Sequence, residues 1–330
     1  MPVSDKYLHD NFNGAFHDRE HQKAFAAQSV APMYATAAPN VMDRKPMTDV
    51  FLPRYMVLGM RSKYGKNYRY LPQYQEEGTC VGQSHSTVST IVLGVSALLA
   101  GFKFPGRAAV APIYAGSRVD IGKNPGTWQG STGSWAAAWL TQYGVTLLEE
   151  LGLNDNPANE KDWLKTLRAD EQMGMKWTAS RDGVPKDKED IAKLRPINQA
   201  PMVTTVEEVR AALSNLTPVN LCGMLHPSQK CDSKGVSTSI SSGGGHSTCL
   251  VGCFLDGSEW WYDFMNSWWF YYTGGFCRSA NKIDQQFKGT VTRISERSLK
   301  GWLKERDCYA MVGVQGLEPV SKEFQMLMKN

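Results

Sequence analysis

The chain has 330 residues, of which 42% are hydrophobic, and its formal net charge is +4 at pH 7. A chain of this length and apolar content can bury one large core or two smaller ones. The charge is mild and no block of Lys and Arg is interleaved with aromatic residues, which argues against a nucleic-acid partner.

The apolar segment 88–99 (VSTIVLGVSALL) is shorter than the ~20 residues that a membrane span needs, so it predicts a buried helix and no membrane partner. The N-terminus lacks the basic-then-apolar pattern of a signal peptide. Seven cysteines without a Cys-x-x-Cys pair indicate reduced thiols, in a cytoplasmic protein or one packed within a particle or virion. No zinc-type spacing of Cys and His is present, and we expect neither a metal nor an organic cofactor.

Residues 1–49 are interpreted as an N-terminal extended arm, punctuated by Ala, Met and Pro, with a short polar helix near 18–28. The arm either crosses its own domain, as an inhibitory pro-segment would, or docks on a neighbouring subunit or large assembly. The aromatic-rich stretch 50–74 predicts a strand and loops, with Pro53 and Pro72 as breaks.

A Gly-Thr turn then presents Cys80 on the first turn of a helix that is expected to run to about Ala100, where Gly101 ends it. The N-terminus of a helix favours the thiolate, which is the nucleophilic form of cysteine. A second helix is predicted to begin near Ser131, Thr132 or Ser134 and to end at Gly144.

Residues 154–200 are charged and interrupted by prolines, which predicts surface helices and loops, or an insertion. Thr205 and Glu208 form a capping box at the start of the following helix. That helix ends at Pro218, and the apolar stretch 219–225 predicts a buried strand.

Two further strands, HSTCLVGCFL and EWWYDFMNSWW, are joined by a turn at Asp256-Gly257. We expect this hairpin to hold His246 and Asn266 near each other. A short amphipathic helix and a last strand follow, and residues 318–330 form a C-terminal tail.

Cys80, His246 and Asn266 are the three residue types that nucleophilic thiol chemistry needs, because a thiol requires a base and the base requires an orienting group. Their order, with Gly before the His and Ser-Trp after the Asn, resembles the papain-like cysteine peptidases of bacterial or viral type. The Tyr-Gly-Val end of the second helix resembles the same family.

The resemblance implies an α+β, two-lobed fold over residues 50–317, with a helical left lobe that carries the nucleophile helix and an antiparallel sheet in the right lobe. It implies a hydrolase, a thiol protease that cleaves a protein or peptide substrate through an acyl-enzyme. Cys80 would be the nucleophile, His246 the base and Asn266 the residue that orients the imidazole.

Two supporting roles also follow from the resemblance. Trp268 would shield the bond between Asn266 and His246 from water. The oxyanion hole would use the backbone N–H of Cys80 and a glutamine, for which we prefer Gln75 over Gln73.

Two other functions fit the sequence. One is a structural or assembly protein, such as a virion component, that keeps a papain-like fold whether active or not. The other, ranked lower, is a cell-wall peptide hydrolase. His85 is interpreted as structural, and His226 as a residue that faces solvent.

Overall fold

In a computed structural model of the chain, the structure describes residues 15, 18–27, 34–37, 39–278, 281–305 and 307–317. The tail predicted at 318–330 and the first 14 residues of the arm therefore lie outside the described residues. The described helices are α2 (Arg19–Ala26), α3 (Tyr34–Ala37), α4 (Pro39–Met42), α5 (Pro53–Tyr64), α6 (Cys80–Ala100), α7 (Ala111–Ala115), α8 (Gly133–Gln142), α9 (Glu160–Ala179), α10 (Lys186–Ala192), α11 (Val206–Ser214) and α12 (Glu296–Leu303), with shorter turns η1 (Gly116–Ile121), η2 (Glu149–Leu151) and η3 (Asp284–Phe287).

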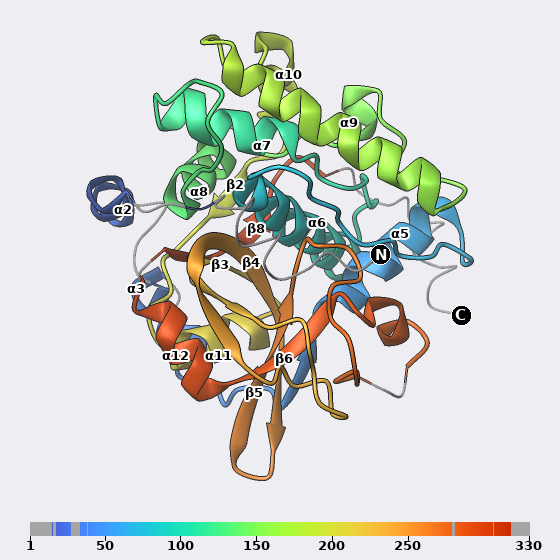
Figure 1. The fold of residues 1–330 in the computed structure, drawn as a ribbon, viewed down its shortest axis with the longest axis vertical. Coiled ribbons are helices and arrows are strands. Elements are labelled where there is room, and N and C mark those ends of the chain that lie inside the picture. The colour runs from blue at the N-terminus through green and yellow to red at the C-terminus, as the bar shows by residue number, and fades with distance from the viewer. Residues whose placement is uncertain are drawn as a thin grey trace.

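The strands form one large and one small antiparallel sheet. They are β1 (Asp49–Phe51), β2 (Ile197–Gln199), β3 (Val219–Pro227), β4 (Ile240–Asp256), β5 (Glu259–Met265), β6 (Val291–Ser295), β7 (Cys308–Ala310) and β8 (Val312–Val314). The large sheet has the order β6-β5-β4-β3-β7, with β1 paired to β4, and β2 pairs with β8. Figure 1 shows α7 to α10 gathered at one end of the molecule and β3 to β6 at the other, with α6 between them. This is the predicted α+β architecture of two halves.

The central helix α6 begins and ends where the sequence predicted. Thr79 precedes its first residue, and Gly101 ends it with a left-handed φ of 72° that suits glycine. Every residue from Cys80 to Gly94 is buried. At Gly82 an added Cβ would lie 2.8 Å from the Cβ of Tyr114, so glycine is what permits the close approach of α6 and α7.

Polar side chains of α6 attach it to both halves of the molecule. On the sheet side, the hydroxyls of Ser84 and Ser247 lie 2.6 Å apart. On the helical side, the Ser86 hydroxyl donates to the Ala108 carbonyl at 2.7 Å, and the Ala108 N–H donates to the Thr90 hydroxyl at 3.1 Å. Because buried polar groups require partners, these bonds fix how α6 sits between the halves.

The prediction of a strand and loops over 50–74 was wrong in one part, since this stretch contains the helix α5. Pro53 occupies the first turn of α5, where the missing N–H of proline costs nothing, so it starts the helix instead of breaking structure. Met56, Val57 and Met60 are buried, and α5 packs against α6.

Several other predicted features are confirmed. The arm contains α2 near the predicted position, and Thr132 caps α8 by accepting from Trp135 N–H at 3.1 Å. The capping box of Thr205 and Glu208 is present at α11. The end of the chain differs, because two short strands, β7 and β8, replace the single strand that was predicted.

The seven cysteines all carry free thiols, and six of them, including Cys249 and Cys253, are buried. Within the described ranges, no helix is both long enough and apolar enough to cross a membrane.

A buried charge cluster ties the large sheet together. The Asp263 carboxylate, which is fully buried on β5, accepts hydrogen bonds from Arg278 Nε at 2.9 Å and from Arg293 Nε at 3.0 Å. Arg278 also donates to the carbonyl of Val50 on β1 at 2.8 Å. Burial would raise the pKa of Asp263, but the two guanidinium groups outweigh burial and lower it.

We predict that Asp263→Ala costs about 3–5 kcal/mol in free energy of unfolding, because it leaves two buried guanidinium groups without their shared partner. Since the pKa of Asp263 is lowered in the folded protein, its contribution should be present near neutral pH and be lost as the pH falls through that lowered pKa. Urea unfolding measures both effects. Asp190→Ala, which breaks an exposed pair with Lys186, should leave the midpoint unchanged; an equal loss in both variants would contradict the prediction.

Candidate active site

Cys80 is the first residue of α6 and has no exposed surface. Burial raises the pKa of its thiol to about 12, and the backbone N–H groups of Ser247, Val81 and Cys80 itself act in the opposite direction. Ser247 follows His246 on β4, so the thiol lies against the strand that carries the predicted base.

His246 and Asn266 are brought together by the pairing of β4 with β5. Cys249 on β4 lies opposite Met265, and Asn266 follows directly at the end of β5. The two side chains are joined at 2.9 Å between His246 Nε2 and Asn266 Oδ1. Because an amide oxygen can only accept, Nε2 carries the hydrogen in this pair.

The other ring nitrogen, Nδ1 of His246, is buried and has no hydrogen-bond partner among the described residues. Burial lowers the pKa of His246 to about 3, the bond to Asn266 acts against that shift, and the neighbouring His226 adds to it. The imidazole is therefore neutral at pH 7, with an unprotonated Nδ1 that can accept a proton.

Trp268 covers the face of the His246 ring. The two ring centroids are 4.1 Å apart and the planes are inclined by 23°. The Trp268 edge also contacts His226, whose ring lies 5.7 Å away. The prediction that His226 faces solvent was wrong, since it is buried where β3 pairs with β4 beside this cluster.

The two candidate glutamines have different surroundings. Gln75 Oε1 accepts from the Ser267 hydroxyl at 2.9 Å, and its Nε2 donates to the carbonyl of Glu77 at 2.7 Å. Ser267 directly follows Asn266, so Gln75 is joined to the segment that bears the predicted orienting residue. Gln73 instead donates to Ser86 on the second turn of α6, at 3.4 Å. The contacts thus favour Gln75 for the role.

His85 lies on α6 with its Nδ1 2.8 Å from the carbonyl of Val81, one turn earlier in the helix. It is fully buried, and burial lowers its pKa to about 4. These contacts agree with the structural interpretation of His85.

One described residue of the arm lies beside His246. The N–H of Ala15 donates to the carbonyl of Gly245 at 3.0 Å, and Ala15 also forms a parallel bridge with Ser131, just before α8. Farther along, Trp135 Nε1 donates to the Asp18 carboxylate at 3.1 Å. The arm therefore runs between the strand of His246 and the N-terminal end of α8.

A residue that the sequence analysis missed is Glu171, on α9. It is buried and contacts the turn that precedes Cys80. The signal was present in the sequence, since Asp170 and Glu171 fall within the buried stripe of α9, which also includes Trp163, Leu167 and Gly174. Two carboxylates on such a face need buried partners.

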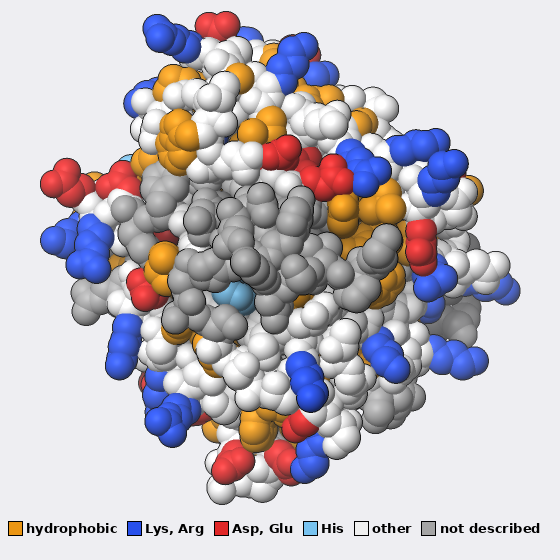
Figure 2. All heavy atoms as spheres, in the orientation of Figure 1, with side chains coloured by type: hydrophobic (Ala, Val, Ile, Leu, Met, Phe, Trp, Pro, Cys, Tyr) orange, Lys and Arg blue, Asp and Glu red, His pale blue; other side chains and the backbone are white. Residues whose placement is uncertain are grey.

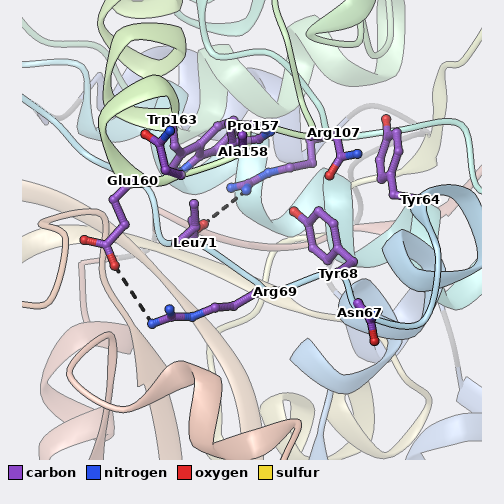
Figure 3. Close-up of a pocket in the computed structure, with 12 residues that line it drawn as sticks. Tyr64, Asn67, Tyr68, Arg69, Leu71, Arg107, Pro157, Ala158, Glu160 and Trp163 are labelled. Atoms are coloured by element: carbon purple, nitrogen blue, oxygen red, sulfur yellow. Dashed lines mark hydrogen bonds and ion pairs between the residues drawn. The ribbon is translucent and has the colours of Figure 1, made fainter.

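A cavity of about 320 Å³ lies on the helical side, and none of the predicted site residues lines it. Figure 3 shows Arg107, Tyr68 and Trp163 around it, with Arg107 Nη1 donating to the carbonyl of Leu71 at 3.1 Å. In the described parts of the chain no three His, Cys, Asp or Glu side chains gather as a metal site. Figure 2 shows Lys and Arg scattered among Asp and Glu on the face that it presents.

No protein-family model matches the sequence, and no curated protein matches it either. Solved structures do match in fold. Xylellain, a cysteine protease from Xylella fastidiosa, is 12% identical with a TM-score of 0.51 over 97% of this chain and 95% of that chain. Procathepsin B S9 from Trypanosoma congolense is 9% identical with a TM-score of 0.56, over 95% of this chain and 89% of that one.

A third structure, the digestive procathepsin L2 proteinase from the larval midgut of Tenebrio molitor, is 9% identical with a TM-score of 0.53, over 94% of this chain and 81% of that chain. At such low identity the likeness concerns the fold. It extends over nearly the whole chain, and it agrees with a helical half and an antiparallel sheet that meet at α6. The chain has the α+β, two-lobed fold of the papain-like cysteine peptidases.

Proposed function

We propose that the chain is a cysteine peptidase that hydrolyses peptide bonds of a protein or peptide substrate. The observation that carries the proposal is the buried bond between His246 Nε2 and Asn266 Oδ1, which leaves Nδ1 as an unpaired base. The next residue, Ser247, directs its N–H at the Cys80 thiol. A nucleophile, a base and an orienting group are the parts that this chemistry requires.

In this mechanism the Cys80 thiol gives its proton to Nδ1 of His246 while sulfur bonds to the scissile carbonyl carbon. The bond from that carbon to the amide nitrogen then breaks, and the imidazolium protonates the leaving amine. Water, deprotonated by His246, cleaves the resulting thioester and restores the thiol. Asn266 keeps Nε2 hydrogen-bonded throughout, so Nδ1 stays the nitrogen that exchanges the proton.

The oxyanion of each tetrahedral intermediate would lie between the backbone N–H of Cys80 and the amide of Gln75. One hydrogen of Gln75 Nε2 bonds the Glu77 carbonyl, which leaves the second hydrogen for the substrate. The Ser267 hydroxyl fixes the amide orientation by donating to Oε1.

We predict that iodoacetamide alkylates Cys80 near neutral pH in the wild-type protein and far more slowly in His246→Ala. Burial keeps the Cys80 thiol protonated at pH 7, with a pKa of about 12, so it reacts only if a base takes its proton during the attack, and His246→Ala removes that base. Peptide mass spectrometry across pH 5–9 measures the rate, with the half-buried Cys277 as reference thiol in the same samples.

In parallel, hydrolysis of a mixed peptide library should fall by at least ~10³-fold in Cys80→Ala. Equal Cys80 alkylation rates in the wild type and His246→Ala, together with no Cys80-dependent hydrolysis, would contradict the peptidase proposal. The fold would then serve a structural or assembly role.

We further propose that residues 1–49 act as a pro-segment-like arm that restricts access to Cys80. Ala15 is hydrogen-bonded to Gly245, next to His246, and α2 packs against α8. Phe25 of α2 is fully buried, with its ring 5.8 Å from that of Tyr309. Through these contacts the described part of the arm packs on its own domain, which is what a pro-segment-like arm requires.

Displacing the arm should raise the rate at which Cys80 is alkylated. In Gly245→Ala the new Cβ would lie 1.6 Å from the Ala15 carbonyl oxygen, so the arm has to move. Ala15→Pro removes the donor of the same contact from the arm side. Because a hydrogen bond contributes about 0.5–1.5 kcal/mol, Ala15→Pro should raise the rate by up to ~10-fold.

The two variants change the contact from opposite sides, so each serves as the control for the other. A higher Cys80 rate in both, with Cys277 unchanged, supports the arm proposal. Unchanged or lower Cys80 rates in both would overturn it.

A further inference from the structure

The turn between Gln75 and Cys80 has its backbone N–H groups bonded by side chains from distant parts of the chain. Glu76 N–H donates to Glu171 Oε2 at 2.9 Å, and Glu77 N–H donates to Glu171 Oε1 at 3.2 Å. Gly78 N–H donates to Gln129 Oε1 at 2.5 Å. Three consecutive donors are thus held by two side chains.

Glu171 also reaches the start of the nucleophile helix. The hydroxyl of Thr79, the residue directly before α6, donates to Glu171 Oε1. A single carboxylate on α9 therefore holds both ends of the turn whose flanking residues, Gln75 and Cys80, would supply the two oxyanion donors.

The same helix follows the chain leading into this turn. Trp163 Nε1, eight residues before Glu171, donates to the carbonyl of Pro72 at 2.8 Å, and Figure 3 shows Trp163 beside Leu71. Between them, Arg168 pairs with Glu76 at 2.7 Å and lies over the ring of Tyr74. Successive turns of α9 thus contact successive residues of the segment 72–79, which leads into Cys80.

We propose that Glu171 is a positioning residue for the peptidase reaction, one that fixes the turn between Gln75 and Cys80, and with it the placement of the Cys80 thiol, without touching the substrate. This inference rests on the proposed function. It assigns a role to α9, which the sequence suggested only as surface structure or an insertion.

The charge state of Glu171 matters for this role. Burial raises its pKa to about 7, Thr79 and the two N–H groups oppose that shift, and the charge of Glu77 adds to it. Besides Glu77, charged side chains on the adjoining segments are the paired Arg168 and Glu76 and the neighbouring Asp170, and α7, which packs on α9, contains no Lys, Arg, Asp or Glu.

Above pH 7 both oxygens of ionised Glu171 accept hydrogen bonds, whereas protonation at lower pH occupies one oxygen with a hydrogen. The hydrogen bonds from the turn to Glu171 should therefore strengthen as the pH rises through 7. Because the folded pKa of about 7 lies above the ordinary value of 4.5, ionisation of Glu171 also lowers the stability of the protein as the pH rises from about 4.5 to about 7.

Asp170, the neighbouring residue on α9, offers a matched control. It is also buried, and its carboxylate accepts from two backbone N–H groups, those of Val110 at 2.7 Å and Ala111 at 2.9 Å. Burial raises its pKa to about 6. Asp170 thus makes the same kind of contact as Glu171, but at the start of α7 and away from the turn.

The experiment compares Glu171→Gln with Asp170→Asn in the full chain, by two measurements. The first is hydrogen exchange of the backbone amides of residues 76–78. The second is the rate of Cys80 alkylation by iodoacetamide between pH 5 and 9, divided by the rate at Cys277. We expect Glu171→Gln to speed the exchange, to lower the Cys80 rate by about tenfold near pH 8, and to remove the rise through pH 7.

Asp170→Asn should leave both measurements at the wild-type values. Faster exchange with an unchanged or higher Cys80 rate in Glu171→Gln would mean that Glu171 is only structural, and unchanged exchange would mean that it does not hold the turn. Either result overturns the inference. Equal Cys80 rates in the wild type and His246→Ala would instead count against the peptidase itself, while the exchange data still test the contact.

A second pair of variants covers the case in which Glu171→Gln does not fold. Thr79→Val removes the hydroxyl that Glu171 accepts from at nearly constant volume, and Thr79→Ser keeps it. A lower Cys80 rate in Thr79→Val that is restored in Thr79→Ser supports the inference. Equal rates in the two variants overturn it.

Discussion

The enclosure of α6 is the constraint on which the rest of the structure depends. A helix that is buried all round from Cys80 to Gly94 exposes no face to water, so each of its polar groups needs a partner within the protein. Ser84 finds its partners on the sheet, and Ser86 finds its partner in the helical half. The two halves are thereby fixed relative to one another, and the N-terminal end of the helix is placed at their boundary.

The chemistry of the candidate site follows from that placement. Cys80 comes from the helix, whereas His246 and Asn266 come from neighbouring strands, so how near the thiol lies to that pair depends on the packing of α6 against the sheet. Burial shifts both titratable groups toward their neutral forms, raising the pKa of the thiol and lowering that of the imidazole. Both groups are therefore neutral at pH 7.

Two segments outside the helix and the sheet contact residues next to this site. The arm lies beside Gly245, between the strand of the base and the start of α8. Glu171 of α9 accepts hydrogen bonds from the turn that leads into Cys80. Both contacts are made largely to backbone groups, so neither adds a reactive side chain.

The sequence by itself determined the local elements and the identity of the candidate triad. The span of α6, the capping box at Thr205 and the strands of His246 and Asn266 could be predicted because caps, glycine stops and apolar runs are encoded by neighbouring residues. Only the tertiary structure gave Gln75 and Gln73 their different partners, buried His226 and brought Glu171 to the turn before Cys80. Those outcomes depend on contacts between residues up to 192 positions apart, and no local pattern specifies which distant partner a buried polar group will meet.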